Sequence, residues 1–171
     1  MKRIIAFVIC LACLSLLLVG CARNGEIDIS NKKIHTDAVG AYIDIIEVKH
    51  TDEGDVLVAV WCNYMDALSS VSNQEKSYIT FGNAYMIEYF NGSEWESVLK
   101  RDFAVTEIAC MLYEGETCEK DYDTQYFDLS REGTYRLICD FYVPEGDRVG
   151  GYETWVEFYV NAKTKFALSG K

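Results

Sequence analysis

The two histidines are the first residues to consider for catalysis, because histidine is a common general base near neutral pH. His35 and His50 are the only histidines, and neither belongs to a His-Glu-x-x-His zinc pattern. The chain contains no Gly-x-Ser-x-Gly nucleophile motif and no Gly-x-x-x-x-Gly-Lys phosphate loop. A cysteine nucleophile needs a histidine beside it as base, and the sequence indicates none. These residue types therefore predict no catalytic residues, and we expect a protein that is not an enzyme.

Two short acidic clusters are candidates for binding a cation. They are Asp52, Glu53 and Asp55 around a glycine, and Asp121 and Asp123 on either side of a tyrosine. Calcium takes about six to eight oxygen ligands, and neither cluster has the complete pattern of a calcium loop. We therefore expect no metal ion and no cofactor.

The N-terminus has the pattern of a secretory signal peptide. A basic start at Lys2 and Arg3 precedes an apolar run that ends in Leu18-Val19-Gly20-Cys21. These last four residues resemble the lipobox of bacterial lipoproteins, which implies cleavage after residue 20 and a diacylglycerol on Cys21. The alternative is that Ile4–Gly20 remains as a spanning helix, but its length is marginal and small Gly20 favours cleavage. Both interpretations place the rest of the chain outside the cytoplasm, and we expect lipid anchoring at the extracytoplasmic face of the membrane.

The remaining chain is strongly acidic. Lys2 and Arg3 leave with the signal peptide, so 14 basic residues stand against 27 acidic ones, a net charge of about −13. Such a surface disfavours nucleic acid and anionic lipid headgroups as partners. The simpler interpretation of this charge is solubility beside a negatively charged envelope.

From residue 40 onward the sequence is typical of β-strands separated by Gly, Asn and Asp turns, and no segment has a long helical period. The expected strands are Ala41–Val48, Asp55–Asn63, Tyr78–Phe81, Ala84–Phe90, Trp95–Lys100, Phe103–Leu112, Glu119–Phe127, Thr134–Val143 and Thr154–Val160, with a short strand near Ile27–Ile29. Spacing of this kind predicts an antiparallel sandwich or barrel.

Alternation along the expected strands predicts which residues share a face. One apolar face consists of Val56, Val58, Val60 and Cys62; others consist of Tyr135, Leu137, Cys139, Phe141 and Val143, and of Val156, Phe158 and Val160. Asn91-Gly92 is a typical type I′ hairpin turn, and Gly115 marks a second turn over Tyr113–Glu116.

Several stretches between about Val56 and Val143 resemble a bacterial immunoglobulin-like domain of Gram-positive extracytoplasmic lipoproteins. They are Val58–Asn63, Phe81–Glu88, Asn91–Trp95 and Leu129–Leu137, the last with a Gly-Thr-Tyr-Arg strand. The resemblance implies an immunoglobulin-like β-sandwich with a surface role and without catalytic residues. We therefore expect a signal peptide over 1–20, a lipid-anchored tether over 21–39 and an immunoglobulin-like β-sandwich domain over 40–171.

Four cysteines remain after the leader and Cys21 are set aside, and an extracytoplasmic compartment permits disulfides. Cys110 and Cys118 are equidistant from Glu114, so a hairpin that turns there would place them opposite each other. Cys62 and Cys139 lie on apolar strand faces, and their pairing is similar to the inter-sheet bridge of immunoglobulin domains. Four reduced, buried thiols are the alternative.

Aromatic residues make up 13% of the chain and are candidates for a stacking surface, although sandwich cores also need them. The candidates are Tyr64, Tyr78, Phe81, Tyr89, Phe90 and Trp95. We expect a non-enzymatic module that binds an unknown protein or envelope component. The alternative is a proteinase-inhibitor-like or sensor accessory domain that acts through an exposed loop such as Asp66–Lys76.

Overall fold

The computed structural model describes residues 25–37, 40–64, 77–106, 108–145 and 147–162. These residues form strands and no helix, so the described part of the chain contains no helix able to cross a membrane. The strands are β1 (Glu26–Thr36), β2 (Ala41–His50), β3 (Asp55–Asn63), β4 (Tyr78–Phe81), β5 (Met86–Phe90), β6 (Trp95–Ser97), β7 (Cys110–Tyr113), β8 (Thr117–Asp123), β9 (Gly133–Glu145) and β10 (Arg148–Asn161).

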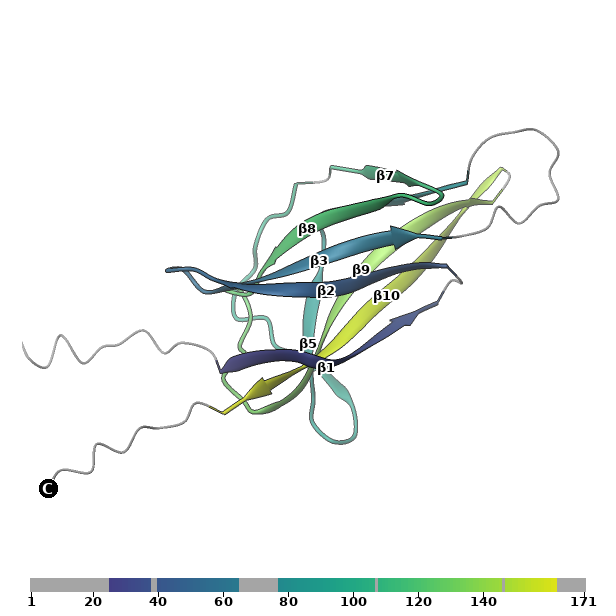
Figure 1. The fold of residues 1–171 in the computed structure, drawn as a ribbon. Helices are drawn as coiled ribbons and strands as arrows, with labels where there is room; N and C mark the ends of the chain where they lie inside the picture. The colour runs from purple at the N-terminus through teal and green to yellow at the C-terminus, as the bar shows by residue number, and fades with distance from the viewer. Residues whose placement is uncertain (1–24, 38–39, 65–76, 107, 146, 163–171) are drawn as a thin grey trace, which may run out of the picture.

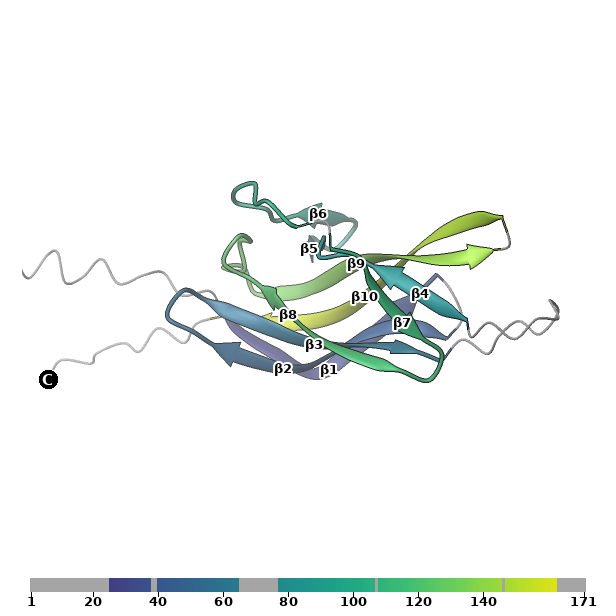
Figure 2. The same cartoon turned by 90° about the horizontal axis from the view of Figure 1, so that it is seen from above.

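The strands make two antiparallel sheets. Sheet A has the order β1-β10-β9-β4-β7, with β5 paired to β9 and β6 paired to β5, and sheet B has the order β2-β3-β8. Figure 2 shows sheet B on one side of β9 and β10, with β5 and β6 on the other. The expected all-β immunoglobulin-like sandwich is therefore confirmed.

The two ends of the described chain lie side by side, because Glu26 of β1 is the register partner of Asn161 of β10. The long β9–β10 hairpin projects at the opposite end of the molecule (Figure 1). The sandwich therefore has one end that carries both termini and one end that is far from them.

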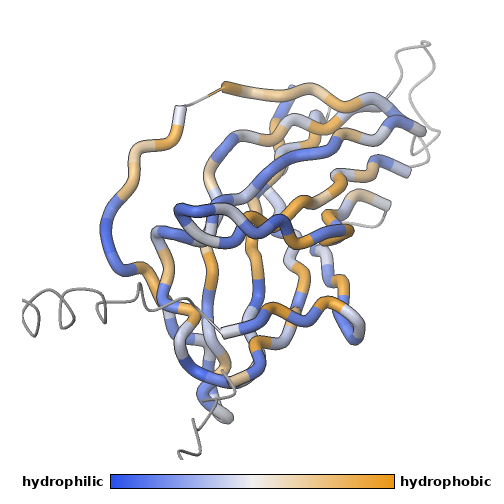
Figure 3. Tube along the Cα trace, turned by 60° about the vertical axis from the view of Figure 1, so that its left-hand side comes forward, coloured by the Kyte–Doolittle hydropathy of each residue, from blue (hydrophilic) through white to orange (hydrophobic). Residues whose placement is uncertain are grey.

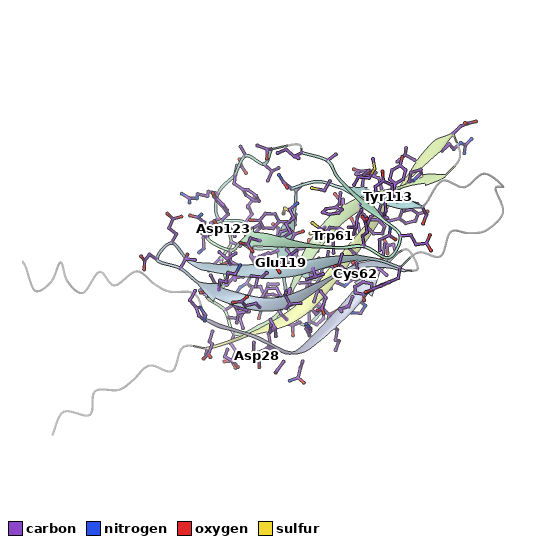
Figure 4. All side chains as sticks on the ribbon, turned by 45° about the horizontal axis from the view of Figure 1, so that its top comes forward. Asp28, Trp61, Cys62, Tyr113, Glu119 and Asp123 are labelled. Atoms are coloured by element: carbon purple, nitrogen blue, oxygen red, sulfur yellow. The ribbon has the colours of Figure 1, made fainter. Side chains whose placement is uncertain are left out.

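A tryptophan lies at the centre of the core between the sheets. The fully buried Trp61 stacks on Phe81 with ring centroids 4.2 Å apart, and its indole N–H donates to the Tyr122 hydroxyl at 2.8 Å. Figure 4 shows Trp61 within the sandwich and, near opposite ends of it, Tyr113 and Asp123. Buried tryptophan and tyrosine need such a partner for their polar atoms, and here each satisfies the other.

Alternation predicted the core faces of β9 and β10 correctly. The apolar sets from Tyr135 to Val143 and from Val156 to Val160 are all buried in the core. Hydrophobic and hydrophilic residues alternate along the tube in Figure 3 as a half-buried sheet requires. These two strands form the longest antiparallel pair of sheet A.

The apolar set from Val56 to Cys62 shares one face of β3, as expected, but that face is not the one that meets sheet A. The side chains that reach the core are Leu57, Ala59 and Trp61, and the set from Val56 to Cys62 lies on the other face. Both faces of this central strand are apolar, so alternation alone does not distinguish them. Pairing decides the matter, because it directs the large Trp61 ring onto Phe81.

Residues 26–36, expected within the tether, form β1 along the edge of sheet A. Ile27 is buried, and the register with β10 shifts between Asp28 and Lys33. The irregularity coincides with the polar run from Ser30 to Lys33. This run interrupts the alternation of apolar and polar residues, so the sequence did not indicate a long strand here. The described sandwich therefore includes residues 26–36, which were expected in the tether.

The expected strand Phe103–Leu112 is largely irregular, with only Cys110–Tyr113 forming β7. Phe103 stacks on Tyr126 with a centroid distance of 4.6 Å and contacts Phe127 edge-on at 5.6 Å. Packing of an aromatic side chain, rather than a strand ladder, thus holds this segment against the sandwich.

The Asn91-Gly92 hairpin exists, but the two-residue type I′ turn was wrong. Phe90 pairs with Trp95, so the loop has four residues, and the Asn91 side chain accepts hydrogen bonds from the backbone N–H groups of Ser93 and Glu94. The asparagine therefore acts as an Asx turn residue. The turn at Gly115 (φ 79°) is confirmed, and it connects β7 of sheet A to β8 of sheet B.

The Gly-Thr-Tyr-Arg stretch begins β9 and has two structural reasons. Gly133 has a φ of 145°, and a Cβ there would lie 2.8 Å from the Tyr89 ring, so a side chain is excluded. The buried Tyr135 donates its hydroxyl to the Arg131 carbonyl at 2.8 Å. This bond to the backbone a few residues upstream is that of a tyrosine corner.

Candidate functional site

Both histidines are engaged with carboxylates at the surface. His35 stacks on Trp155 with centroids 5.1 Å apart, and its Nε2 lies 3.1 Å from Glu157 Oε1. His50 Nδ1 lies 2.7 Å from Asp55 Oδ1 at the β2–β3 hairpin. The two imidazole rings lie in different parts of the fold, His35 on β1 and His50 at the end of β2.

Carboxylates of the two acidic clusters contact neighbouring side chains and backbone N–H groups. Asp55 contacts His50, and Asp121 accepts a hydrogen bond from Lys49 at 3.3 Å. Asp123 accepts the backbone N–H of Gln125 at 3.0 Å and also the side-chain amide of that residue. No group of three or more His, Cys, Asp or Glu side chains that could hold a metal ion exists among the described residues.

The four cysteines outside the N-terminal region, namely Cys62, Cys110, Cys118 and Cys139, are free thiols in the structure. Cys139 belongs to the core, whereas Cys62 lies on the opposite face of β3, beside Tyr42. Cys110 and Cys118 lie on strands of different sheets, not opposite each other in one hairpin. The structure therefore contains neither expected disulfide: Cys62 faces away from the core that holds Cys139, and Cys110 and Cys118 belong to different sheets.

Burial keeps the core thiol protonated. Loss of solvent raises the pKa of Cys139 to about 12, against smaller opposing effects of the Tyr122 hydroxyl and the Lys120 ammonium. Burial also raises the pKa of Cys62. Thiols of this kind are poor nucleophiles, because the thiolate is the reactive form.

The aromatic candidates do not form one surface. Phe81 is buried against Trp61, and Tyr89 packs on Tyr135 under the Arg131 guanidinium. Phe90 and Trp95 face each other across the β5–β6 hairpin at 5.2 Å. The two remaining tyrosines pair elsewhere, in the contacts Tyr42–Tyr64 at 6.2 Å and Tyr78–Tyr113 at 5.9 Å. The loop 66–76 lies outside the described residues.

The outer face of sheet A carries a rung of alternating charge. Glu88, Arg136, Glu157 and Lys33 are successive register partners across β5, β9, β10 and β1. The Arg136 guanidinium donates to Glu88 Oε2 at 2.6 and 2.9 Å. It lies 4.5 Å from the Trp95 ring centroid and 5.5 Å from that of Trp155. This rung is electrostatically matched within the protein.

Two rungs further along β9, the charges are not matched. Asp140 and Glu153 are direct register partners, and both side chains are exposed. Within the described chain neither carboxylate has a salt-bridge or hydrogen-bond partner of its own. Like charges directly opposite in an antiparallel pair destabilise the sheet. The backbone N–H of Glu153 adds a third carboxylate nearby by donating to Asp37 at 3.3 Å.

A groove of about 520 Å³ opens at this point, between the outer face of sheet A and the irregular segment 99–105. Its apolar lining consists of Met86, Leu99, Phe103, Val105 and Ile138. Its carboxylates are Glu88, Asp102, Asp140 and Glu153. A second hollow of about 340 Å³ shares Asp140 and Glu153 and adds Asp37 and Tyr142. The groove therefore combines an apolar floor with a carboxylate edge, an arrangement suited to binding rather than to proton transfer.

The groove residues were not among the candidate site residues predicted from the sequence. The signal that could have found them was the hairpin between the last two expected strands, because its register makes Asp140 and Glu153 partners. Register depends on the turn, which a pattern of alternation does not specify.

The comparisons with known proteins agree with this fold. A family model described as a bacterial Ig-like domain matches residues 63–162, which is more than half of the chain. The match starts at the last residue of β3 and runs past the end of β10. No curated protein and no solved structure matches the chain. Together with the sandwich, its tyrosine corner and its buried tryptophan, the match shows that the chain belongs to the bacterial Ig-like domain family.

Proposed function

We propose that the protein is a lipid-anchored extracytoplasmic binding module that holds a protein or envelope component in the groove on the outer face of sheet A. The observation that carries the proposal is the groove itself, an apolar hollow on the outer face of the sheet whose register-paired carboxylates, Asp140 and Glu153, have no salt-bridge or hydrogen-bond partner within the described chain. Family membership supports a surface or interaction role without catalysis.

The anchor follows from the N-terminal sequence. The Leu18-Val19-Gly20-Cys21 motif motivates the lipid on Cys21, and Gly25 is already tied to the domain by its N–H, which donates to the Leu129 carbonyl at 3.1 Å. Four residues of chain span at most about 14 Å. The lipid would thus hold the terminal end of the sandwich close to the membrane.

The groove lies along the flank of the sandwich and is independent of the loop tips. Val105 lies on its rim with 36% of its surface exposed, so a photoreactive residue there would touch a bound partner. Ile46 of β2 is a matched control, since it is an exposed aliphatic residue of sheet B.

The test is photo-crosslinking in the native envelope with p-benzoylphenylalanine at Val105 or at Ile46. We expect a discrete adduct from position 105 and none of the same mass from position 46. Adducts of equal yield from both positions, or none from position 105, would contradict the proposed groove.

A further inference from the structure

We infer that the occupant of the groove is a lysine- or arginine-bearing segment of a partner protein. This inference rests on the proposed function, because it names the chemistry of the partner for the same groove. The order of the rungs along the outer face of sheet A carries the argument.

The first step is the contrast between two rungs. Around Arg136 the sheet supplies its own cation between Glu88 and Glu157. Around Asp140 and Glu153 the described chain supplies none, although the two carboxylates face each other across the ladder. A cation from outside would complete the second rung in the way that Arg136 completes the first.

The second step is the surface between these rungs. Across β5, β9 and β10 the intervening rung contains Met86, Ile138 and Trp155, all without charge, and it continues on β1 to His35. The groove itself continues from Met86 and Ile138 onto Leu99 and Phe103. Lysine and arginine bury their aliphatic stems on apolar surface and keep their charged groups at its edge. The floor fits the stem of such a side chain, and the carboxylates at its edge fit the head group.

The arrangement of the carboxylates favours a basic side chain over a metal ion as the occupant of the groove. A hard cation such as calcium needs about six or more oxygen ligands around one point. No metal-holding group of three or more acidic, histidine or cysteine side chains is found over the described residues. The carboxylates are instead distributed along the groove, with Asp102 on the irregular segment and Asp140 and Glu153 on the sheet. Carboxylates spread along a groove in this way fit several basic side chains of one peptide segment better than a single metal ion.

The test measures binding of a fluorescent hexa-arginine peptide to the full-length protein in detergent at about 0.15 M salt. At this ionic strength the Debye length is about 8 Å, so distant charges contribute little. The test variant is Asp140→Asn with Glu153→Gln. The matched control is Asp52→Asn with Glu53→Gln, which removes the same charge from the exposed β2–β3 turn.

We expect the groove variant to weaken peptide binding at least about tenfold, since the loss of even one charge-assisted hydrogen bond, on the order of 1.5 kcal/mol, corresponds to a factor of about ten. The control should change it less than twofold, and a hexa-glutamine peptide should not bind. Equal weakening by both variants would show general attraction to an acidic protein and would overturn the inference.

Two further measurements keep the test decisive. Asp102→Asn lies outside the strands and should weaken binding about threefold without disturbing a ladder. In the envelope, the position-105 adduct should disappear in the Asp140→Asn, Glu153→Gln protein. If the adduct persists in this variant, the groove binds a partner that does not need the two carboxylates. That result would overturn the inference of a basic segment and leave the proposed function standing. Absence of any adduct in the wild type would overturn the proposed function.

Discussion

At the scale of single residues, Tyr122 connects two other buried polar groups in the middle of the core, the Trp61 indole and the Cys139 thiol. Its hydroxyl accepts the Trp61 indole N–H at 2.8 Å and forms a hydrogen bond with the Cys139 thiol. Burial raises the pKa of Tyr122 as well as that of Cys139, so both groups stay neutral in the folded protein. These hydrogen bonds satisfy the buried polar atoms of Trp61, Tyr122 and Cys139, which would otherwise destabilise the core.

The Cys139 thiol should make the protein less stable in alkaline solution. Its folded pKa of about 12 lies above the ordinary value of 9.0, so above pH 9 the unfolded chain loses a proton that the folded chain keeps. The thiol therefore has its full stabilising effect below pH 9, and the free energy of unfolding falls as the pH rises toward 12. The slope from one thiol is at most about 1.4 kcal/mol per pH unit.

Urea denaturation between pH 8 and pH 11 checks this expectation. Cys139→Ala should lower stability at pH 8 by leaving a small cavity, but it should flatten the dependence above pH 9. Cys118→Ala, on the partly exposed β8 position, is the control and should retain the wild-type slope. A wild-type slope in Cys139→Ala protein would show that this thiol is not the titrating group.

At the scale of elements, β3 shows how a central strand is positioned by its partners. It pairs with β2 on one side and β8 on the other, and it directs Trp61 into the core. The neighbouring Val60 is partly exposed on the opposite face. Because successive side chains of a strand point to opposite faces, the Trp61 face of sheet B meets sheet A and the Val60 face is directed away from it.

Alanine substitutions on β3 test this arrangement. Trp61→Ala should lower the free energy of unfolding by roughly 3–5 kcal/mol, because it opens a cavity beside Phe81 and leaves the Tyr122 hydroxyl without its donor. Val60→Ala should cost about 1 kcal/mol or less. Chemical denaturation measures both, and a larger cost for Val60→Ala would mean that β3 has the opposite face inward.

At the scale of the whole molecule, the proposed lipid anchor and the proposed binding groove belong to different parts of the chain. The terminal end of the sandwich carries Gly25, and the β9–β10 hairpin projects at the other end (Figure 1). The groove lies between these ends, on the outer face of sheet A. A lipid at the N-terminus would therefore leave the groove open to partners in the envelope.

Substitution of Cys21 tests the proposed lipid anchor. Cys21→Ser should block acylation and cleavage together, so that the protein keeps residues 1–20 and its intact mass lacks a diacylglycerol. Cys13→Ser, inside the leader, is the matched control and should leave processing unchanged. Intact-mass measurement of the membrane fraction decides, and a wild-type protein that begins at Met1 would contradict the lipoprotein assignment.

The sequence alone was sufficient for properties that depend on local patterns. Alternation over Tyr135–Val143 and Val156–Val160 predicted the core faces of β9 and β10, and turn residues predicted the strands on either side of Asn91 and Gly115. The bacterial immunoglobulin-like domain followed from stretches such as Gly-Thr-Tyr-Arg and is shown by the family match. The lipid on Cys21 remains a prediction from the N-terminal motif.

Tertiary structure decided whatever depends on register between distant segments. Strand β3 is apolar on both faces, so only its packing against Phe81 placed Trp61 in the core between the sheets and Cys62 on the opposite face. Asp140 and Glu153 are ordinary surface residues until the β9–β10 ladder makes them partners. The groove requires, in addition, that Phe103 anchor an irregular segment beside that ladder. A period of two is local to one strand, whereas pairing joins residues far apart in the chain, and for that reason the groove forms only in the folded molecule.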